Sequence, residues 1–232
     1  MYGNSHAAKA SLLSFYPARA SQLMQHLVTR NQSEHLIADW REQQMVKFIF
    51  SLTYNVDELL HGFNQKRIWK LAWAGRNLLE LAIWVEYCNF SPANAKQFRD
   101  DSSRDLLGTG RSIQKQVELS VGKPNAERHK AMNELVKMVD DQFGVSDLGD
   151  DYTKVVEAAT SLGRKNDFAH ANKLLSKYAH PTAISLNSSL PSSAEFDAGF
   201  RDMFLSEGAE YATRAITLLK DEIVRIYPPE DV

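Results

Sequence analysis

The chain has 232 residues, of which 44% are hydrophobic, and 27 Lys and Arg residues against 29 Asp and Glu residues give a net charge of -2. The hydrophobic fraction is enough to fill a core, so the composition excludes a globally disordered chain. The near-neutral charge argues against a dedicated DNA-binding protein, and any other nucleic-acid partner has to be held by a local basic patch.

Cysteine usage and hydropathy indicate the compartment. Cys88 is the only cysteine, which excludes an internal disulfide and a zinc site built from cysteines. It follows an apolar run, so we expect its thiol to be buried. The N-terminus lacks a secretion signal, and nowhere do about 18 apolar residues run together. We therefore expect a cytoplasmic protein without a membrane partner.

Apolar residues recur at spacings of three and four along most of the chain, and strand-like alternation is rare, which predicts an all-α fold. We expect one all-helical domain, residues 1–232, in which the N-terminal helices within 5–30 either join the bundle or form an appended arm. Long helices with short connections predict an antiparallel bundle with additional short helices.

Glycine, proline and capping residues predict where the helices end. A helix from about residue 33 to 61 should stop at Gly62, and the next, from about 65 to 87, should give way to a helix that Ser91 caps. Further breaks are predicted at 108–110, 121–124 and 144–151. The last helix opens with Ser192 and Glu195 at capping-box spacing and is expected to reach Tyr227.

The helix from about 65 to 87 carries a charged pair in an aromatic sector that includes Trp69, Trp73 and Trp84. The opposite side of this helix is also apolar, so we expect Arg76 and Glu80 to be buried among aromatic rings. Such a pair is either an internal salt bridge that fixes helix packing or a guanidinium and carboxylate that line a ligand pocket. Spacing alone leaves both interpretations open.

The stretch 163–183 combines a helix start with several basic residues. We expect Gly163 to end one helix and Asn166 or Asp167 to cap the next. Arg164 and Lys165 precede this helix, whose free N–H groups make a phosphate site plausible. One face is then polar and basic, and the opposite face is apolar; the basic face is equally typical of a solvated surface. The polar, basic face carries His170, Lys173 and Lys177, and the apolar face carries Phe168, Ala171, Leu175 and Tyr178.

Arg164 and His170, with five intervening residues, resemble the R-x4-6-H signature of the HEPN superfamily, whose members are all-helical bundles. The resemblance implies a metal-independent ribonuclease, usually a dimer whose two motifs meet at the interface. It also implies that His170 is a general acid or base at the ribose 2′-hydroxyl and that Arg164 stabilises the phosphorane charge. The chain departs from this pattern at Lys165, where active members commonly have Asn, Asp or His.

A second resemblance rests on "RNLLE" at 76–80 and "LLSKYAHPTA" at 174–183. These stretches are similar to a group of uncharacterised bacterial all-helical proteins related to HEPN domains. The resemblance implies that Arg76, Glu80, Ser176 and His180 are the marked positions and that His180 approaches the charged pair. His180 also precedes a proline, so it can equally be a residue that ends a helix and interacts with the helix dipole.

Glu58 and His61 are candidate metal ligands, because they have the Glu-x-x-His spacing of di-iron bundles. Such sites need a second proper motif, so we expect capping by His61, no metal and no cofactor. Gly-rich phosphate cradles and serine-nucleophile motifs are absent from the sequence.

The residues, together with what the two resemblances imply, leave two hypotheses open. The first is a HEPN-like metal-independent ribonuclease or nucleotide-binding protein, a homodimer with RNA or a nucleotide as its partner, in which Arg164, His170 and His180 are catalytic. The second is a catalytically silent helical module that binds a protein or a small ligand. The expected binding residues are Arg76, Glu80, Lys173, Ser176, Lys177 and Tyr178.

Overall fold

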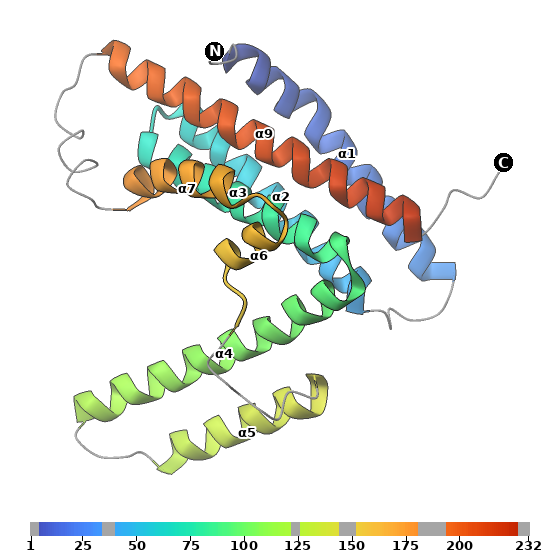
Figure 1. Cartoon of the computed structure of the whole chain (residues 1–232), viewed down its shortest axis with the longest axis vertical. Coiled ribbons are helices and arrows are strands. Elements are labelled where there is room, and N and C mark those ends of the chain that lie inside the picture. Colours follow the sequence, from blue (N-terminus) through green and yellow to red (C-terminus); the bar gives the residue numbers. More distant parts are fainter. Residues whose placement is uncertain (1–4, 34–39, 122–125, 144–151, 181–193, 227–232) are drawn as a thin grey trace. The chain divides into compact units, whose positions relative to one another are not determined.

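The computed structural model describes residues 5–33, 40–121, 126–143, 152–180 and 194–226 (Figure 1). Within these ranges every regular element is a helix, so the all-α prediction is confirmed. The helices form two compact units. We call Met1–Phe90 with Val155–Val232 the main unit, and Ser91–Lys154 the inserted unit.

The main unit is a helical bundle built around α3 (Ile68–Phe90). This helix packs against α2, α6, α7 and α9, while α1 packs against α9 and α2 (Figure 1). Long helices are thus accompanied by the short α6, as the sequence predicts. The bounds of the other helices are α1 (Ser5–Ser33), α2 (Trp40–Asn64), α6 (Val155–Ser161), α7 (Lys165–Ala179) and α9 (Ala194–Ile226).

The core of the main unit forms where α3 meets α2 and α9. Leu71 and Leu78 of α3, Leu52 of α2 and Phe204 of α9 have no solvent exposure. Burying one such side chain contributes about 1.5–3 kcal/mol relative to leaving it exposed. Cys88, also on α3, is 5% exposed, so the predicted buried thiol is confirmed.

The turn between α2 and α3 differs from the prediction, because Gly62 does not end the helix. Helix α2 continues to Asn64, and the reversal occurs at Lys66, whose φ of 57° is left-handed. The N–H of Arg67 then bonds the carbonyl of Gly62 at 2.9 Å. A glycine inside a helix costs only about 1 kcal/mol, which the packing of α2 on α3 outweighs.

The inserted unit is a helical hairpin of α4 (Pro92–Val121) and α5 (Ala126–Phe143). The predicted cap is confirmed, because Ser91 Oγ accepts the N–H of Asn94 at 3.1 Å. The predicted break at 108–110 is wrong: α4 runs through both glycines. Its packing against α5 and the favourable residues on either side outweigh about 1 kcal/mol per glycine.

Other predicted boundaries fall partly outside the described residues. Helix α4 ends at Val121, at the start of the predicted 121–124 break, whereas 122–125 and 144–151 are outside. The capping residue Ser192 and the end at Tyr227 are also outside, while α9 covers Ala194–Ile226. No helix in the described ranges is long and apolar enough to cross a membrane.

Candidate functional site

The side chain of Arg76 is the centre of a polar cluster on the main unit. Its Nη2 lies 2.8 Å from Glu80 Oε1, one turn along α3. From α7, Asn172 Oδ1 accepts the Nε–H of Arg76 at 3.1 Å, and His180 Nε2 lies 2.9 Å from Nη1. Three nitrogens of one guanidinium therefore each meet a different polar side chain.

The charged pair is partly exposed, contrary to the prediction of a buried pair. The side chains of Arg76 and Glu80 keep 28% and 27% of their accessible surface. Full burial costs several kcal/mol per ion before attraction and hydrogen bonds offset it. An arrangement in which α7 supplies polar partners and water still reaches the pair is lower in free energy.

His180 reaches Arg76 because α7 ends there. It is the C-cap residue, with φ −111° and ψ 156°, and its N–H bonds the carbonyl of Ser176. The following proline disfavours helical geometry at this position, which explains the extended backbone. The guanidinium only donates, so His180 Nε2 is the acceptor in this contact. The sequence expectation that His180 approaches the pair is confirmed.

Asn172 completes the cluster, and sequence reasoning missed it. Its Oδ1 accepts from Arg76 and also from the hydroxyl of Ser176, at 3.1 Å in each case. Asn172, Ser176 and His180 follow one another at intervals of four, so they share one side of α7. This four-residue spacing is the sequence pattern from which Asn172 could have been predicted. We call Arg76, Glu80, Asn172, Ser176 and His180 the Arg76 cluster.

Arg164 belongs to a different arrangement. It precedes α7 as the N-cap residue, directly after Gly163, whose φ of 71° ends the preceding turn. Its Nε and Nη2 donate to Glu86 Oε1 at 3.3 and 3.2 Å, and Arg214 of α9 donates to the other oxygen of the same carboxylate. Burial lowers the pKa of Arg214. Glu86 therefore joins α3 to α9 and to the start of α7.

The N-terminus of α7 also differs from the sequence expectation. The helix begins at Lys165, and Arg164 makes no side-chain cap, so the prediction that Asn166 or Asp167 caps it is wrong. In the part of the chain that the structure describes, no hydrogen bond or ion pair joins Arg164 to His170. The bonds of Arg164 to Glu86 hold its side chain toward α3, whereas His170 is exposed on α7.

Sequence reasoning missed both Glu86 and Arg214. An acidic residue on a helix that is apolar on two sides requires a cationic partner, and that was the available signal for Glu86. A pocket of about 670 Å³ lies beside this carboxylate. Its lining comes from α1, α3 and α9 together with Arg164, and includes Ser11, Glu86, Arg164, Thr213 and Arg214.

The remaining predicted residues of α7 lie on two sides of the helix. The predicted basic face is exposed at His170, Lys173 and Lys177. Tyr178 is 7% exposed and packs against Phe200 and Phe204, with ring centroids at 4.9 and 5.3 Å. Burial raises the pKa of Tyr178. Its ring is therefore part of the core.

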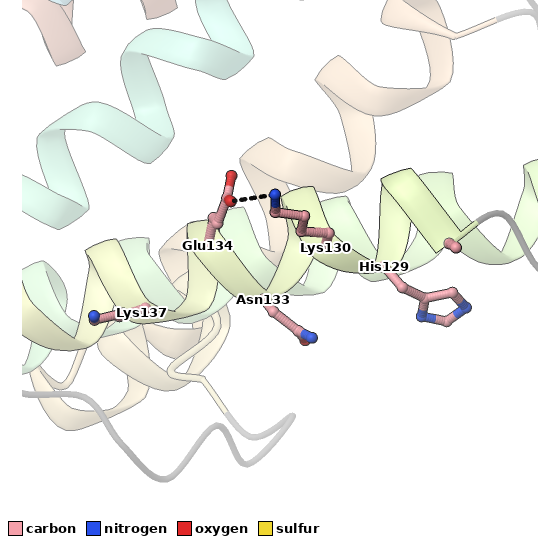
Figure 2. A pocket seen from close by; sticks show the side chains of 6 residues that line it. His129, Lys130, Asn133, Glu134 and Lys137 are labelled. Carbon is pink, nitrogen blue, oxygen red and sulfur yellow. Dashed lines mark ion pairs between the residues drawn. The ribbon is translucent and has the colours of Figure 1, made fainter.

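Two further features are the candidate metal ligand Glu58 and a pocket on α5. Glu58 binds Lys70 at 2.6 Å, and among the described residues no group of three or more His, Cys, Asp or Glu side chains is placed to hold a metal ion. Figure 2 shows a pocket of about 650 Å³ whose lining side chains, among them His129, Asn133 and Lys137, all come from α5. The lining residues lie on one face of α5, and His129 Nε2 is 2.8 Å from Glu118 Oε1 of α4.

Within the main unit, the Arg76 cluster is thus the place where a guanidinium, a carboxylate, a hydroxyl and an accessible imidazole meet. Comparison with known proteins yields no matching family model, no matching curated protein and no matching solved structure.

Proposed function

We propose that this chain is a metal-independent ribonuclease whose reaction centre is the Arg76 cluster. The observation that carries the proposal is the 2.9 Å contact between Arg76 Nη1 and His180 Nε2, at a position where His180 is exposed. A guanidinium and a neutral imidazole are the groups that phosphodiester cleavage needs when no metal takes part. RNA is the substrate implied by the resemblance of Arg164 and His170 to the HEPN signature, whereas the resemblance that marks Arg76 and His180 names no substrate.

The reaction follows from the roles of the two groups. When an RNA phosphate binds the guanidinium of Arg76, His180 Nε2 loses its bond to Nη1 and accepts the proton of the ribose 2′-hydroxyl. The 2′-oxygen attacks phosphorus, the bond from phosphorus to the 5′-oxygen breaks, and Arg76 stabilises the charge on the phosphorane. The 5′-oxygen takes a proton from water, and the imidazolium returns its proton to the hydroxide. The products are a 2′,3′-cyclic phosphate and a 5′-hydroxyl.

Glu80 and Asn172 have positioning roles in this proposal. They hold Nη2 and Nε of the guanidinium, which directs Nη1 toward His180. Together with the contact between Nη1 and His180, these two contacts use three of the five N–H donors of the arginine, so further donors remain for a phosphate. Arg164 does not take this role, because its guanidinium is bound to Glu86.

The test is cleavage of a mixed RNA pool by the full chain in EDTA, with identification of the new end groups. His180→Ala should reduce the rate by about 10²–10⁴-fold, the usual contribution of an acid or base. His170→Ala is the matched control, because His170 is another exposed histidine of α7, and it should leave the rate unchanged. Cleavage that survives His180→Ala, or no cleavage by the folded native protein, contradicts the proposal.

The same contacts favour a second function, a catalytically silent binding module. Each of Nε, Nη1 and Nη2 of Arg76 already has a partner within the chain, as expected of a clamp between α3 and α7. In that case Arg76→Ala and His180→Ala lower the free energy of unfolding, while neither the native protein nor a variant cleaves RNA.

A further inference from the structure

Large aromatic side chains lie on the outer surface of the main unit beside the Arg76 cluster. Phe50 and Tyr54 on α2 are 63% and 57% exposed, and Trp69 on α3 is 55% exposed. Trp73 is half-buried, and its ring meets that of Tyr54 edge-on at 6.3 Å. We call these four residues the aromatic surface.

The aromatic surface leads directly to Arg76 along α3. Trp69 and Trp73 are one turn apart, and Trp73 and Arg76 are three residues apart, so all three lie on one side of the helix. Tyr54 extends the surface onto α2, which packs against α3. A ligand that bridges aromatic rings and a guanidinium therefore finds both on one continuous face.

Among the charged residues described as exposed on α2 and in its connection to α3, cations outnumber carboxylates. The carboxylates of Glu58 and Glu80 are paired with Lys70 and Arg76 at 2.6 and 2.8 Å, so neither adds net negative charge. Lys47 precedes Phe50 by one helical turn, and further cations occupy the connection to α3. The exposed charged residues are Lys47, Asp57, Lys66 and Arg67.

We infer that the aromatic surface binds the bases of single-stranded RNA while an adjoining phosphate reaches Arg76; this inference rests on the proposed ribonuclease function. Aromatic rings next to cations are how single-stranded nucleic acids are held, because each base stacks on a ring and each phosphate meets a positive charge. An apolar protein partner would not require the cations. A duplex would hide the base faces, so the expected substrate is an unpaired strand.

The test measures binding separately from cleavage. The probe is a single-stranded 2′-O-methyl oligonucleotide of mixed sequence, which lacks the attacking hydroxyl, and its anisotropy is followed with the full chain in EDTA. The double variant Tyr54→Ala/Trp69→Ala should bind about tenfold more weakly or worse. Phe90→Ala is the matched control, because Phe90 is 71% exposed and lies on the same helix, roughly 30 Å from Trp69 at about 1.5 Å per residue.

The outcomes distinguish failure of RNA binding by the aromatic surface from failure of the proposed cleavage at the Arg76 cluster. Loss of affinity in the double variant but not in Phe90→Ala supports the aromatic surface, even if native RNA stays intact and the reaction itself is refuted. RNA binding by the aromatic surface is refuted if the double variant and the native protein bind the probe equally, or if the native protein does not bind it. A protein partner would then be the expected ligand of this surface. Cleavage abolished by His180→Ala together with equal affinities would refute only the aromatic surface.

Discussion

The Nη1 atom of Arg76 lies 2.9 Å from the Nε2 atom of His180, although 104 positions separate the two residues along the chain. The contact joins the outer face of α3 to the C-terminal end of α7, and the bond from Arg76 to Asn172 joins the same helices earlier along α7. One guanidinium thus contacts α7 at two places, in addition to the packing of the buried α7 side chains Phe168 and Leu175.

Replacing Arg76 should loosen α7 on α3. We expect Arg76→Ala to lower the free energy of unfolding by about 1–3 kcal/mol, because two hydrogen bonds of about 0.5–1.5 kcal/mol each and a partly exposed ion pair with Glu80 are lost. Urea unfolding followed by tryptophan fluorescence measures this, since Trp40, Trp69, Trp73 and Trp84 all belong to the main unit. Lys173→Ala on the exposed side of α7 is the control, and an equal loss in both variants would contradict the clamp.

Glu86 is expected to be coupled to both of its arginines. Glu86→Gln leaves Arg164 and Arg214 without a carboxylate and should destabilise the main unit by about 1–3 kcal/mol. Arg214→Ala should cost more than Arg164→Ala, because their side chains are 25% and 40% exposed. Double-mutant cycles in urea measure each coupling, and strictly additive effects would show that Glu86 acts with neither arginine.

Helices α2 and α9 approach each other closely at Gly208. A Cβ there would lie 2.6 and 2.8 Å from side-chain carbons of Leu59, which has no solvent exposure. Gly208→Ala should therefore lower the stability by about 1–3 kcal/mol through overpacking. Gly199→Ala on the same helix meets nothing within 4 Å and should raise stability by about 0.5–1 kcal/mol. Thermal unfolding of both variants tests the opposite signs.

The thiol of Cys88 should react only after unfolding. Burial raises its pKa to about 12, although Arg41 acts in the opposite direction. At pH 8 the folded protein therefore holds the unreactive thiol form and keeps reagent away from it. We expect negligible alkylation by iodoacetamide until urea unfolds the main unit. A cysteine introduced by Ala169→Cys, at an exposed position of α7, should react at once, and equally fast labelling of Cys88 would contradict the burial.

Acid should weaken the inserted unit through Asp101. Burial alone would raise the pKa of this carboxyl, but hydrogen bonds from Thr153, Gln97 and Arg104 outweigh burial and lower it. The ionised carboxylate therefore stabilises the fold above the unfolded-state pKa of about 3.9, and this contribution is lost as pH falls through the lower folded value.

An acid titration followed by circular dichroism measures this loss. Asp101→Asn should unfold the hairpin more readily at neutral pH and show a weaker acid dependence than the native protein. Asp105→Asn, at an exposed position of the same helix, is the control and should follow the native curve. Identical curves for native protein and Asp101→Asn would rule out the role of this carboxylate.

The sequence predicts what depends on local physics. The helical class, the Ser91 cap and the buried Cys88 each follow from spacing or from neighbouring residues, and the structure confirms them. The approach of His180 to Arg76 was predicted from a resemblance to a group of all-helical proteins, and the 2.9 Å contact confirms the approach itself.

What the sequence could not predict depends on long-range packing. The bond of Arg164 to Glu86 spans 78 positions, and no local pattern separates it from a pairing with His170. The break at Gly108 was wrongly predicted, and α2 ends at Asn64, just beyond the predicted Gly62, because a glycine marks a weak point of a helix, whereas the tertiary contacts of that helix decide where it ends. The exposure of Arg76 likewise depends on how much of α3 its neighbours cover.

The insertion of Ser91–Lys154 between the two parts of the main unit has a consequence for synthesis of the chain. Helix α3 leaves the ribosome before its partners α6, α7 and α9 have been translated, and the delay to the end of α9 is on the order of ten seconds. During this interval the apolar sides of α3 have only α1 and α2 to pack against. Nascent chains that stop before α9 should therefore recruit chaperones or aggregate, whereas chains that include α9 can close the bundle.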